Sequence, residues 1–331
     1  MRARHQHRIM TKSRILIIAA EGLEQFVPGL GAAAAIRSHH CEAEIIVLTA
    51  KSLASFAKTA PYFDQVWVDD LRGTWDLTRI WALRKRLIAC AFERVYDLDA
   101  SAKSARIFWL MYGLNGLPLR RRNLQWSGAA KNTALTHGAA QWNAMHVIDR
   151  LAAQLSAADI SGMHRPDLSW VARNVQSFDV PFPIHERFVL VALSSNAGST
   201  WPISYYAELA QLLHVEGYIP VLAGFDVAPE FCSDIARACD SALNLVNQVS
   251  PEDLVFLAWA ACAAVGPNNG MMHVTAAAAC HSVILYDTAS DPALVGQRGE
   301  SVIIIRRPRL SDISAGEVMT AIIKSTKIRD I

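Results

Sequence analysis

Short, continuously apolar segments alternate with helical segments along this chain, first over residues 14–112 and again over residues 188–326. Strands that are apolar throughout are typical of parallel sheets, because helices cover both faces of such a sheet. The repeated alternation therefore predicts an α/β protein with two doubly wound parallel sheets. The expected strands are residues 14–20, 43–49, 65–69, 94–99, 188–193, 219–224, 242–245, 258–265, 282–286 and 301–306.

Helical periodicity and capping residues place the helices between these strands. The first helix is expected to start near Pro28 or Gly31, after a loop that contains Glu24. Trp201 and Pro202 open a later helix, since proline is tolerated in a first turn. The remaining helices are expected at residues 53–58, 75–90, 101–112, 146–155, 228–239, 250–259 and 315–326.

A stretch with several prolines and few periodic apolar residues separates the two series. We place a linker at residues 166–186, an N-terminal domain at residues 14–165, and a C-terminal domain at residues 187–331 whose last helix is able to return to the N-terminal domain. Residues 1–13 form a basic leader that is expected to be disordered, because it lacks the apolar core of a secretory signal. Met10 is an alternative start.

The composition argues against several functional classes. A net charge of +2 gives no field that would favour nucleic acid as a partner. The sequence contains no apolar run of about 18 residues, which argues against a transmembrane helix. The six cysteines show no Cys-x-x-Cys or other zinc-binding spacing, so we expect reduced thiols and no metal site.

Residues 265–273 read Val-Gly-Pro-Asn-Asn-Gly-Met-Met-His and are followed by a run of small residues. This pattern indicates a buried strand, a tight turn and the start of a helix. In an open α/β sheet, ligands bind beyond the carboxyl ends of the strands, and the free N–H groups of a helix N-terminus favour phosphate there. The alternative is an ordinary turn with a surface histidine, His273.

Two other features bear on the ligand. Arg120, Arg121 and Arg122 form a basic cluster that is either a solvated loop or a patch facing phosphate or carboxylate groups. The loop after the first strand lacks Gly-x-Gly-x-x-Gly, so it is not a dinucleotide-binding fingerprint.

Several separated motifs, taken in their order, resemble one family. They are Gly-Leu-Glu-Gln at 22–25 with Leu-Gly-Ala at 30–32, Tyr-Asp-Leu-Asp at 96–99 with Lys103, His-Val-Ile-Asp-Arg at 146–150, residues 194–202, Gly-x-x-His at 270–273, and Leu-Tyr at 285–286 with Asp-Pro at 291–292. From about residue 14 to the last helix, the chain is similar to glycosyltransferase family 9, the ADP-heptose:lipopolysaccharide heptosyltransferases. The joint order of the motifs carries this resemblance.

The resemblance implies the GT-B fold, in which two Rossmann-like domains face each other across a cleft. It implies inverting, metal-independent transfer of a sugar, a heptose, from an ADP-linked donor to a cell-envelope glycan, with no cofactor. The implied acceptor is an anionic or lipid-linked glycan, and the implied location is the cytoplasm, with peripheral association at the inner membrane. Such a reaction needs a base for the acceptor hydroxyl and a non-metal stabiliser for the departing diphosphate.

The resemblance also assigns roles to residues. Glu24 is the candidate base, and Gln25 occupies the position of the family's aspartate. Donor contacts are expected from Ser195, Asn196, Ser199, Thr200, Gly224, Asp226, Asn268, Asn269, Gly270 and His273. Acceptor contacts are expected from Lys103, Arg120, Arg121 and Arg122.

Three charged positions of the family pattern are neutral in this chain. Gln25 and Asn268 replace aspartates, and Ser199 replaces a lysine whose charge-assisted hydrogen bond would be worth about 1.5–3 kcal/mol. Two hypotheses follow: a divergent but active transferase, or a catalytically impaired protein of the same fold that binds a nucleotide sugar or acts as a scaffold. A sugar-nucleotide epimerase of related fold is a third.

Overall fold

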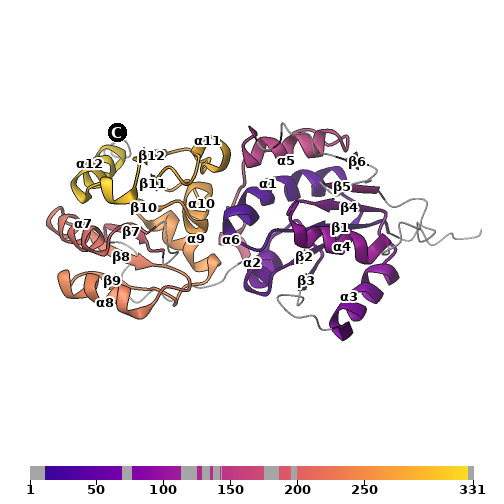
Figure 1. Ribbon diagram of the computed structural model, residues 1–331, viewed down its shortest axis with the longest axis horizontal. Coiled ribbons are helices and arrows are strands. Elements are labelled where there is room, and N and C mark those ends of the chain that lie inside the picture. Colours follow the sequence, from indigo (N-terminus) through magenta and orange to yellow (C-terminus); the bar gives the residue numbers. More distant parts are fainter. Residues whose placement is uncertain are drawn as a thin grey trace, which may run out of the picture. The chain divides into compact units, whose positions relative to one another are not determined.

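The computed structural model describes residues 12–68, 77–112, 125–128, 135–136, 142, 144–174, 186–194 and 200–326. These residues form two sheets of six strands each, and every recorded strand pair is parallel (Figure 1). The two sheets have equivalent strand orders, β3-β2-β1-β4-β5-β6 and β9-β8-β7-β10-β11-β12. The predicted pair of doubly wound parallel sheets is confirmed.

The chain divides into two compact units. The first consists of Met1–Ala19, Ala33–Gly138 and Gln154–Ser161, and the second consists of Ala20–Ala32, Ala139–Ala153 and Gly162–Ile331. The second unit therefore contains the second sheet together with the beginnings of two helices, α1 (Leu23–His39) and α5 (Val147–Ser156). Of the predicted leader, only residues 12 and 13 belong to the described part of the chain.

The first sheet contains four predicted strands and two that the sequence pattern does not predict. Its strands are β1 (Arg14–Ile18), β2 (Glu44–Thr49), β3 (Gln65–Val68), β4 (Arg94–Asp97), β5 (Gln125–Gly128) and β6 (Leu135–Thr136). β5 and β6 have no apolar run, so periodicity misses them. β5 is held in the sheet by Trp126, which is fully buried with its ring 5.1 Å from that of Phe108.

The helices of the first half lie close to their predicted positions. In addition to α1 and α5 they are η1 (Lys51–Leu53), α2 (Ala54–Thr59), α3 (Leu77–Ala89), α4 (Ala102–Tyr112) and the short α6 (Val171–Asn174), which was not predicted. α3 and α4 contact each other, and Leu87 of α3 is buried in the core below them.

The start of α1 differs from the prediction. The helix begins at Leu23, upstream of Pro28, so Glu24 and Gln25 lie in its first turn and not in a loop. A carboxylate is favourable there because it complements the positive end of the helix dipole. Pro28 removes one N–H from the helix, and the buried side chains of Phe26 and Leu30 hold the turns on either side of it.

The second sheet follows the prediction with small shifts. Its strands are β7 (Phe188–Ala192), β8 (Ile219–Ala223), β9 (Leu243–Asn244), β10 (Ala263–Pro267), β11 (Ser282–Tyr286) and β12 (Val302–Arg306). Its helices are α7 (Ile203–Val215), α8 (Pro229–Ala238), α9 (Pro251–Ala260), α10 (Gly270–Ala277), α11 (Pro292–Val295), η3 (Leu310–Asp312) and α12 (Ala315–Thr326).

The predicted start of one strand in this sheet, β10, is wrong. The apolar run from Ala258 does not begin β10, because Ala258 still belongs to α9. A capping box starts that helix, in which the Ser250 hydroxyl accepts a hydrogen bond of 3.1 Å from the Asp253 N–H. The helix then runs through the first apolar residues of the segment, and the strand begins only at Ala263.

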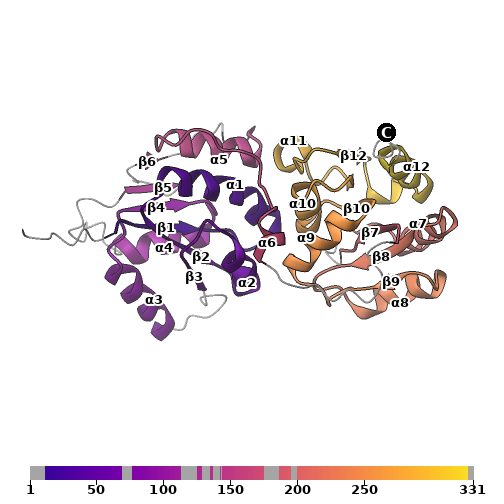
Figure 2. The same ribbon diagram turned by 180° about the vertical axis from the view of Figure 1, so that it is seen from behind.

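Helices cover both faces of the second sheet. Figures 1 and 2 show α7, α8 and α12 on one face and α9 and α10 on the other. Every residue of β7, β10 and β11 is buried, as expected for strands in the centre of a covered parallel sheet. The loops that leave the carboxyl ends of these strands are therefore held by strands that are fully buried.

Candidate functional site

The order of the second sheet places a ligand-binding position between β7 and β10. These two strands pair directly, and the chain order reverses between them. In such sheets the loops leaving the two strands diverge, and ligands bind outside their carboxyl ends. Gly266 allows the strands to approach here, since an added β-carbon would lie 2.7 Å from the Ala192 Cβ.

The turn after β10 leads directly into α10, as the sequence motif predicts. Asn269 is the N-cap of this helix, and its side-chain oxygen accepts a hydrogen bond of 3.2 Å from the Met272 N–H. The N-terminus of a helix carries a partial positive charge and unpaired N–H groups, which favour a bound anion. The described geometry at the predicted turn is therefore one that favours a bound anion.

Glu24 lies beside this helix start. A β-carbon added to Gly270 would be 2.6 Å from the Leu23 Cβ, 3.1 Å from the Glu24 backbone nitrogen and 3.2 Å from Glu24 Oε2. Glycine is therefore required at the first position of α10, because the start of α1 occupies the space of a side chain. Both segments belong to the second unit, so one compact unit brings the carboxylate of Glu24 to the start of α10.

The half-buried Asn268 is hydrogen-bonded to two buried side chains, Tyr286 and Gln297. The Tyr286 hydroxyl lies 2.7 Å from Gln297 Oε1, and Gln297 Nε2 donates a hydrogen bond of 2.7 Å to Asn268 Oδ1. The Tyr286 hydroxyl is also 3.1 Å from Asn268 Oδ1. An amide suits this half-buried position because its oxygen accepts from neutral donors without adding a charge beside them.

His273 is buried in α10 with 6% of its surface exposed, so the alternative of a surface histidine is wrong. Burial, assisted by the nearby His146, lowers the pKa of His273 to about 4. The imidazole is therefore neutral near pH 7. It therefore adds no net charge to an anion bound at the start of α10.

His146 connects the start of α5 to the loop after α11. Its Nδ1 accepts a hydrogen bond of 3.1 Å from the Ile148 N–H, so its Nε2 carries the proton and donates to the Gly296 carbonyl at 2.8 Å. Burial lowers the pKa of His146. Two residues further along the loop, Arg298 makes a bidentate ion pair with Asp149, with both contacts at 2.6 Å.

Comparison with known proteins decides the family. The family model of glycosyltransferase family 9 (heptosyltransferase) matches residues 80–319, which is most of the chain. This chain belongs to glycosyltransferase family 9. The resemblance found in the sequence motifs is thereby confirmed, and the chain takes its place in a family of glycosyltransferases.

Individual relatives agree with this assignment. Lipopolysaccharide heptosyltransferase 2 of Salmonella typhimurium is 38% identical over 95 residues, a match that spans 27% of this chain and 27% of that protein. The structure of E. coli ADP-heptose lipopolysaccharide heptosyltransferase II matches with a TM-score of 0.74 at 19% identity, covering 96% of this chain and 100% of that one. A family 9 glycosyltransferase of Veillonella parvula gives a TM-score of 0.76 at 15% identity, over 96% and 97% of the two chains.

The remaining family positions are only partly described. Ser195, Asn196, Ser199 and Arg120 to Arg122 lie outside the described residues, and of Lys103 only the backbone is described. Thr200 is half-buried and directly precedes Trp201. Trp201 is fully buried and fixes the end of this loop, since its Nε1 donates a hydrogen bond of 2.9 Å to the Ile313 carbonyl.

The loop after β8 contributes the two other predicted donor residues. Gly224 is required because an added β-carbon would lie 2.6 Å from Val227 Cγ2. Asp226 has a positive φ of 54° and an exposed side chain. Asn247 holds the loop by accepting from the Val227 N–H at 3.2 Å and donating to its carbonyl at 2.8 Å. The Asp226 carboxylate is thus presented to solvent beyond the carboxyl end of β8.

Sequence reasoning missed Tyr286, Gln297 and Arg298 as site residues. Tyr286 is the last residue of a predicted strand. Its position in the sequence could therefore have indicated a hydroxyl group at the carboxyl edge of the sheet. Gln297 and Arg298 follow α11 with no pattern that distinguishes them from an ordinary loop. Only the fold shows that this loop contacts both Asn268 and the start of α5.

The corresponding edge of the first sheet carries a buried carboxyl group. Asp97 ends β4, is 1% exposed, and accepts a hydrogen bond of 2.9 Å from the Ala100 N–H. Burial raises the pKa of Asp97 to about 6. Gln154 supports the same edge, donating to the carbonyls of Asp97 at 3.0 Å and of Ser127 at 3.1 Å.

Among the helices within the described part of the chain, none has both the length and the apolar character needed to cross a membrane.

Proposed function

We propose that this member of family 9 transfers a sugar, a heptose, from an ADP-linked donor to a cell-envelope glycan with inversion and without a metal. The observation that supports this most strongly is the position of the Glu24 carboxylate beside the start of α10. A base and an anion-binding helix end lie together there, and a transfer of this kind needs both.

In this proposal the donor diphosphate binds at the N-terminus of α10. The free N–H groups near Gly270 and the helix dipole stabilise the negative charge that grows on the departing ADP. His273 is neutral, and Asn268 carries an uncharged amide that is bonded within the protein. Neither residue therefore adds a negative charge that would repel the diphosphate. The hydroxyl and amide groups of Ser195, Asn196, Ser199 and Thr200 complete the diphosphate contacts, and Asp226 contacts the nucleoside.

Glu24 then acts as the base. It removes the proton from the acceptor hydroxyl as that oxygen attacks the anomeric carbon and the bond to the diphosphate breaks. The electron pair of that bond leaves with ADP, and inversion follows from attack on the face opposite the leaving group. Gln25, the residue in the position of the family's aspartate, cannot take this role because an amide does not accept a proton near pH 7.

The acceptor in this proposal is an anionic, lipid-linked glycan of the envelope. Lys103 and Arg120 to Arg122 are the cations assigned to its phosphate or carboxylate groups, and the reaction takes place in the cytoplasm, where the enzyme associates peripherally with the inner membrane. The names of the relatives, which include a lipopolysaccharide heptosyltransferase, support this acceptor class.

A transfer assay tests the proposal. The protein is incubated with ADP-heptose and a truncated lipopolysaccharide core, and ADP release and product mass are measured, with GDP- and UDP-linked sugars as comparison donors. Product with an added heptose is expected only from the ADP donor. Product formed equally from all three donors would contradict the assigned nucleotide.

A second candidate function is supported by the neutral positions. Gln25 and Asn268 lack the charges of the family pattern, and Asn268 has neutral hydrogen-bond partners inside the protein. A protein that binds the nucleotide sugar without transferring it would show the same features. Two measurements distinguish such a binding protein from a transferase. The binding protein would bind the donor in calorimetry but would release no ADP in the presence of the acceptor.

A further inference from the structure

Helix α3 carries an unusual combination of residues. Its thirteen residues, Leu-Thr-Arg-Ile-Trp-Ala-Leu-Arg-Lys-Arg-Leu-Ile-Ala, include four cations and no acid. The neighbouring helix α4, Ala102–Tyr112, also contains cations and no acid. A helix that only covers a sheet usually mixes both signs on its outer face, so the one-sided charge requires an explanation.

The same helix exposes large apolar side chains. Leu77 is 66% exposed and Trp81 is 64% exposed, and Trp109 on the adjacent α4 is 46% exposed. Leu77, Trp81 and Lys85 follow one another at intervals of four residues, so they lie on one face of the helix. Leu87 is the one side chain of α3 that is fully buried among the described residues. The inner face of the helix packs on the core through Leu87 and the half-buried Leu83, while its outer face offers exposed apolar area to a partner.

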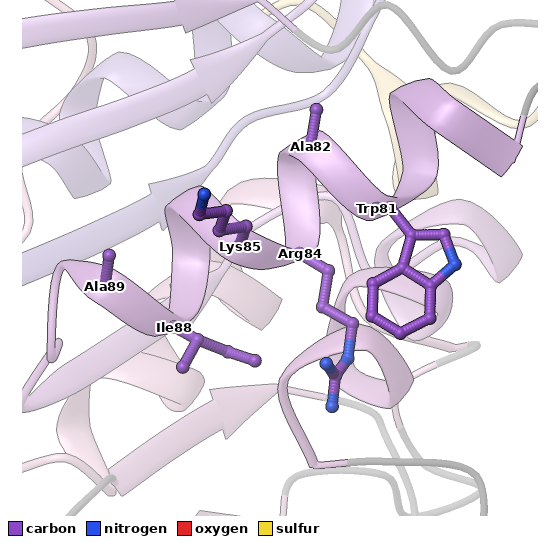
Figure 3. A pocket seen from close by; sticks show the side chains of 6 residues that line it. All are labelled: Trp81, Ala82, Arg84, Lys85, Ile88 and Ala89. Carbon is purple, nitrogen blue, oxygen red and sulfur yellow. The ribbon is translucent and has the colours of Figure 1, made fainter.

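Two cations, Arg84 and Lys85, flank this apolar face. The Arg84 guanidinium lies 5.5 Å from the centre of the Trp81 ring, and Lys85 is exposed one residue further. Trp81, Ala82, Arg84, Lys85, Ile88 and Ala89 line a hollow on this helix, and Figure 3 shows Trp81, Arg84 and Ile88 pointing to the same side of it. An exposed tryptophan flanked by flexible cations on a helix is the arrangement found where helices lie in a membrane interface.

We propose that α3 is a docking surface for an anionic phospholipid bilayer. The charge complementarity commits the surface to this occupant, because Arg84 and Lys85 on this face, in a helix without an acid, are attracted by the negative potential of such a membrane. The indole ring suits the headgroup region, where an apolar body and an N–H are both accommodated. The inference deepens the proposed function, since a lipid-linked acceptor lies in the same membrane.

Sedimentation with vesicles tests this surface independently of catalysis. The full-length protein is mixed with vesicles of phosphatidylglycerol and phosphatidylcholine or of phosphatidylcholine alone, without substrates. We expect binding to the anionic vesicles to be at least about tenfold stronger, to weaken with added salt, and to fall about tenfold again in the double variant Trp81→Ser, Lys85→Glu. The matched control is Val215→Ser, Arg237→Glu, which changes an exposed apolar residue and an exposed cation on α7 and α8 and should bind like the wild type.

Three outcomes would overturn the proposal. The first is equal binding of the wild type to both vesicle types, and the second is an equal loss of vesicle binding in the control variant. The third is self-association of the wild type, seen by light scattering, that disappears in the α3 variant, because the partner would then be a second copy of the chain. If the double variant does not fold, Lys85→Glu alone gives the comparison. Transfer to a soluble core glycan, measured in parallel, shows whether the proposed activity fails separately from membrane binding.

Discussion

The two sheets have the same strand order, but the edges at their switch points carry different groups. Between β1 and β4 the first sheet presents Asp97, a buried carboxyl whose pKa is raised to about 6. Between β7 and β10 the second sheet is followed by Asn268, Asn269 and Gly270, which carry no charge, and by a neutral His273. An anion is thus repelled by ionised Asp97 at one edge, whereas at the other the strand-end residues are neutral and the helix N-terminus offsets the nearby Glu24 carboxylate. Equivalent topology creates two edges that differ in charge, and our proposal assigns the diphosphate to the second because its strand-end residues are neutral.

Among the variants that test this difference between the two edges, Glu24→Gln is expected to have the largest effect on transfer. The change keeps the size of the side chain and removes the only group in the first turn of α1 that can accept a proton. General bases contribute about 10²- to 10⁴-fold to rate, so kcat should fall within that range while the KM for the donor changes little. Single-turnover transfer kinetics measure this.

Gln25→Ala is the matched control for that experiment, because it changes the exposed neighbour in the same turn. It should retain transfer within about threefold, an energy difference of under 1 kcal/mol. Equal losses in the two variants would show that the first turn of α1 is needed for structure and that Glu24 is not the base.

A smaller effect is expected from Gly270→Val. The new side chain would collide with Leu23 and the Glu24 backbone, so α10 and the start of α1 must separate. Overpacking of this kind costs about 1–3 kcal/mol, and we expect the affinity for ADP to fall by at least about tenfold. Gly316→Ala in α12 is the control, because no atom lies within 4 Å of its added β-carbon. Unchanged ADP affinity in Gly270→Val would remove α10 from the site.

The edge of the first sheet is tested by pH. The folded-state pKa of Asp97, about 6, lies above its usual value of 3.8, so the folded protein binds more protons than the unfolded chain between these values. Stability should therefore be highest below pH 3.8, as far as this group is concerned, and should decrease as pH rises through 6. The decrease is on the order of 1–3 kcal/mol.

Urea unfolding of the wild type and Asp97→Asn measures this contribution across that pH range. The asparagine oxygen can still accept from the Ala100 N–H, so the variant should lack the decrease and gain on the wild type as pH rises. A pH dependence that is identical in the two proteins would mean that Asp97 is not the titrating group.

The smallest predicted effect concerns the ion pair of Asp149 and Arg298. Both side chains are more than a third exposed, so Asp149→Asn should lower the free energy of unfolding by only about 0.2–1 kcal/mol. Arg298 lowers the pKa of Asp149, so this contribution is present above pH 3.8 and is lost as pH falls through the lowered folded-state value. Thermal unfolding should show the gap between the two proteins closing in acid and in high salt, whereas a gap that grows in acid would contradict the assigned sign.

Much of this fold could be predicted from the sequence, because apolar runs such as those of β7 and β11 leave few alternatives to a covered parallel sheet. The strands β5 and β6 could not, since Gln125–Gly128 and Leu135–Thr136 depend on tertiary contacts such as the burial of Trp126. The start of α1 was also missed, because Pro28 is normally a sign of a helix beginning and here lies inside one.

The candidate site was predicted where a local motif specifies the backbone. The turn and the helix start at residues 265–273 are local features, and the structure has both; that Asn269 is the N-cap was not predicted. The partners of Asn268 were not predictable, because Tyr286 and Gln297 are brought to it by β11 and by the loop after α11. The position of Glu24 beside Gly270 likewise arises from segments far apart in the sequence.

The central claim is that the N-terminus of α10 binds the diphosphate of an ADP-linked donor. Calorimetric titration of the wild-type protein with ADP, and with UDP and GDP in parallel, tests it most directly. We expect saturable binding of ADP that is at least about tenfold tighter than that of UDP or GDP and is weakened by Gly270→Val. Absence of ADP binding to the folded wild type, or ADP binding that Gly270→Val leaves unchanged, would contradict it.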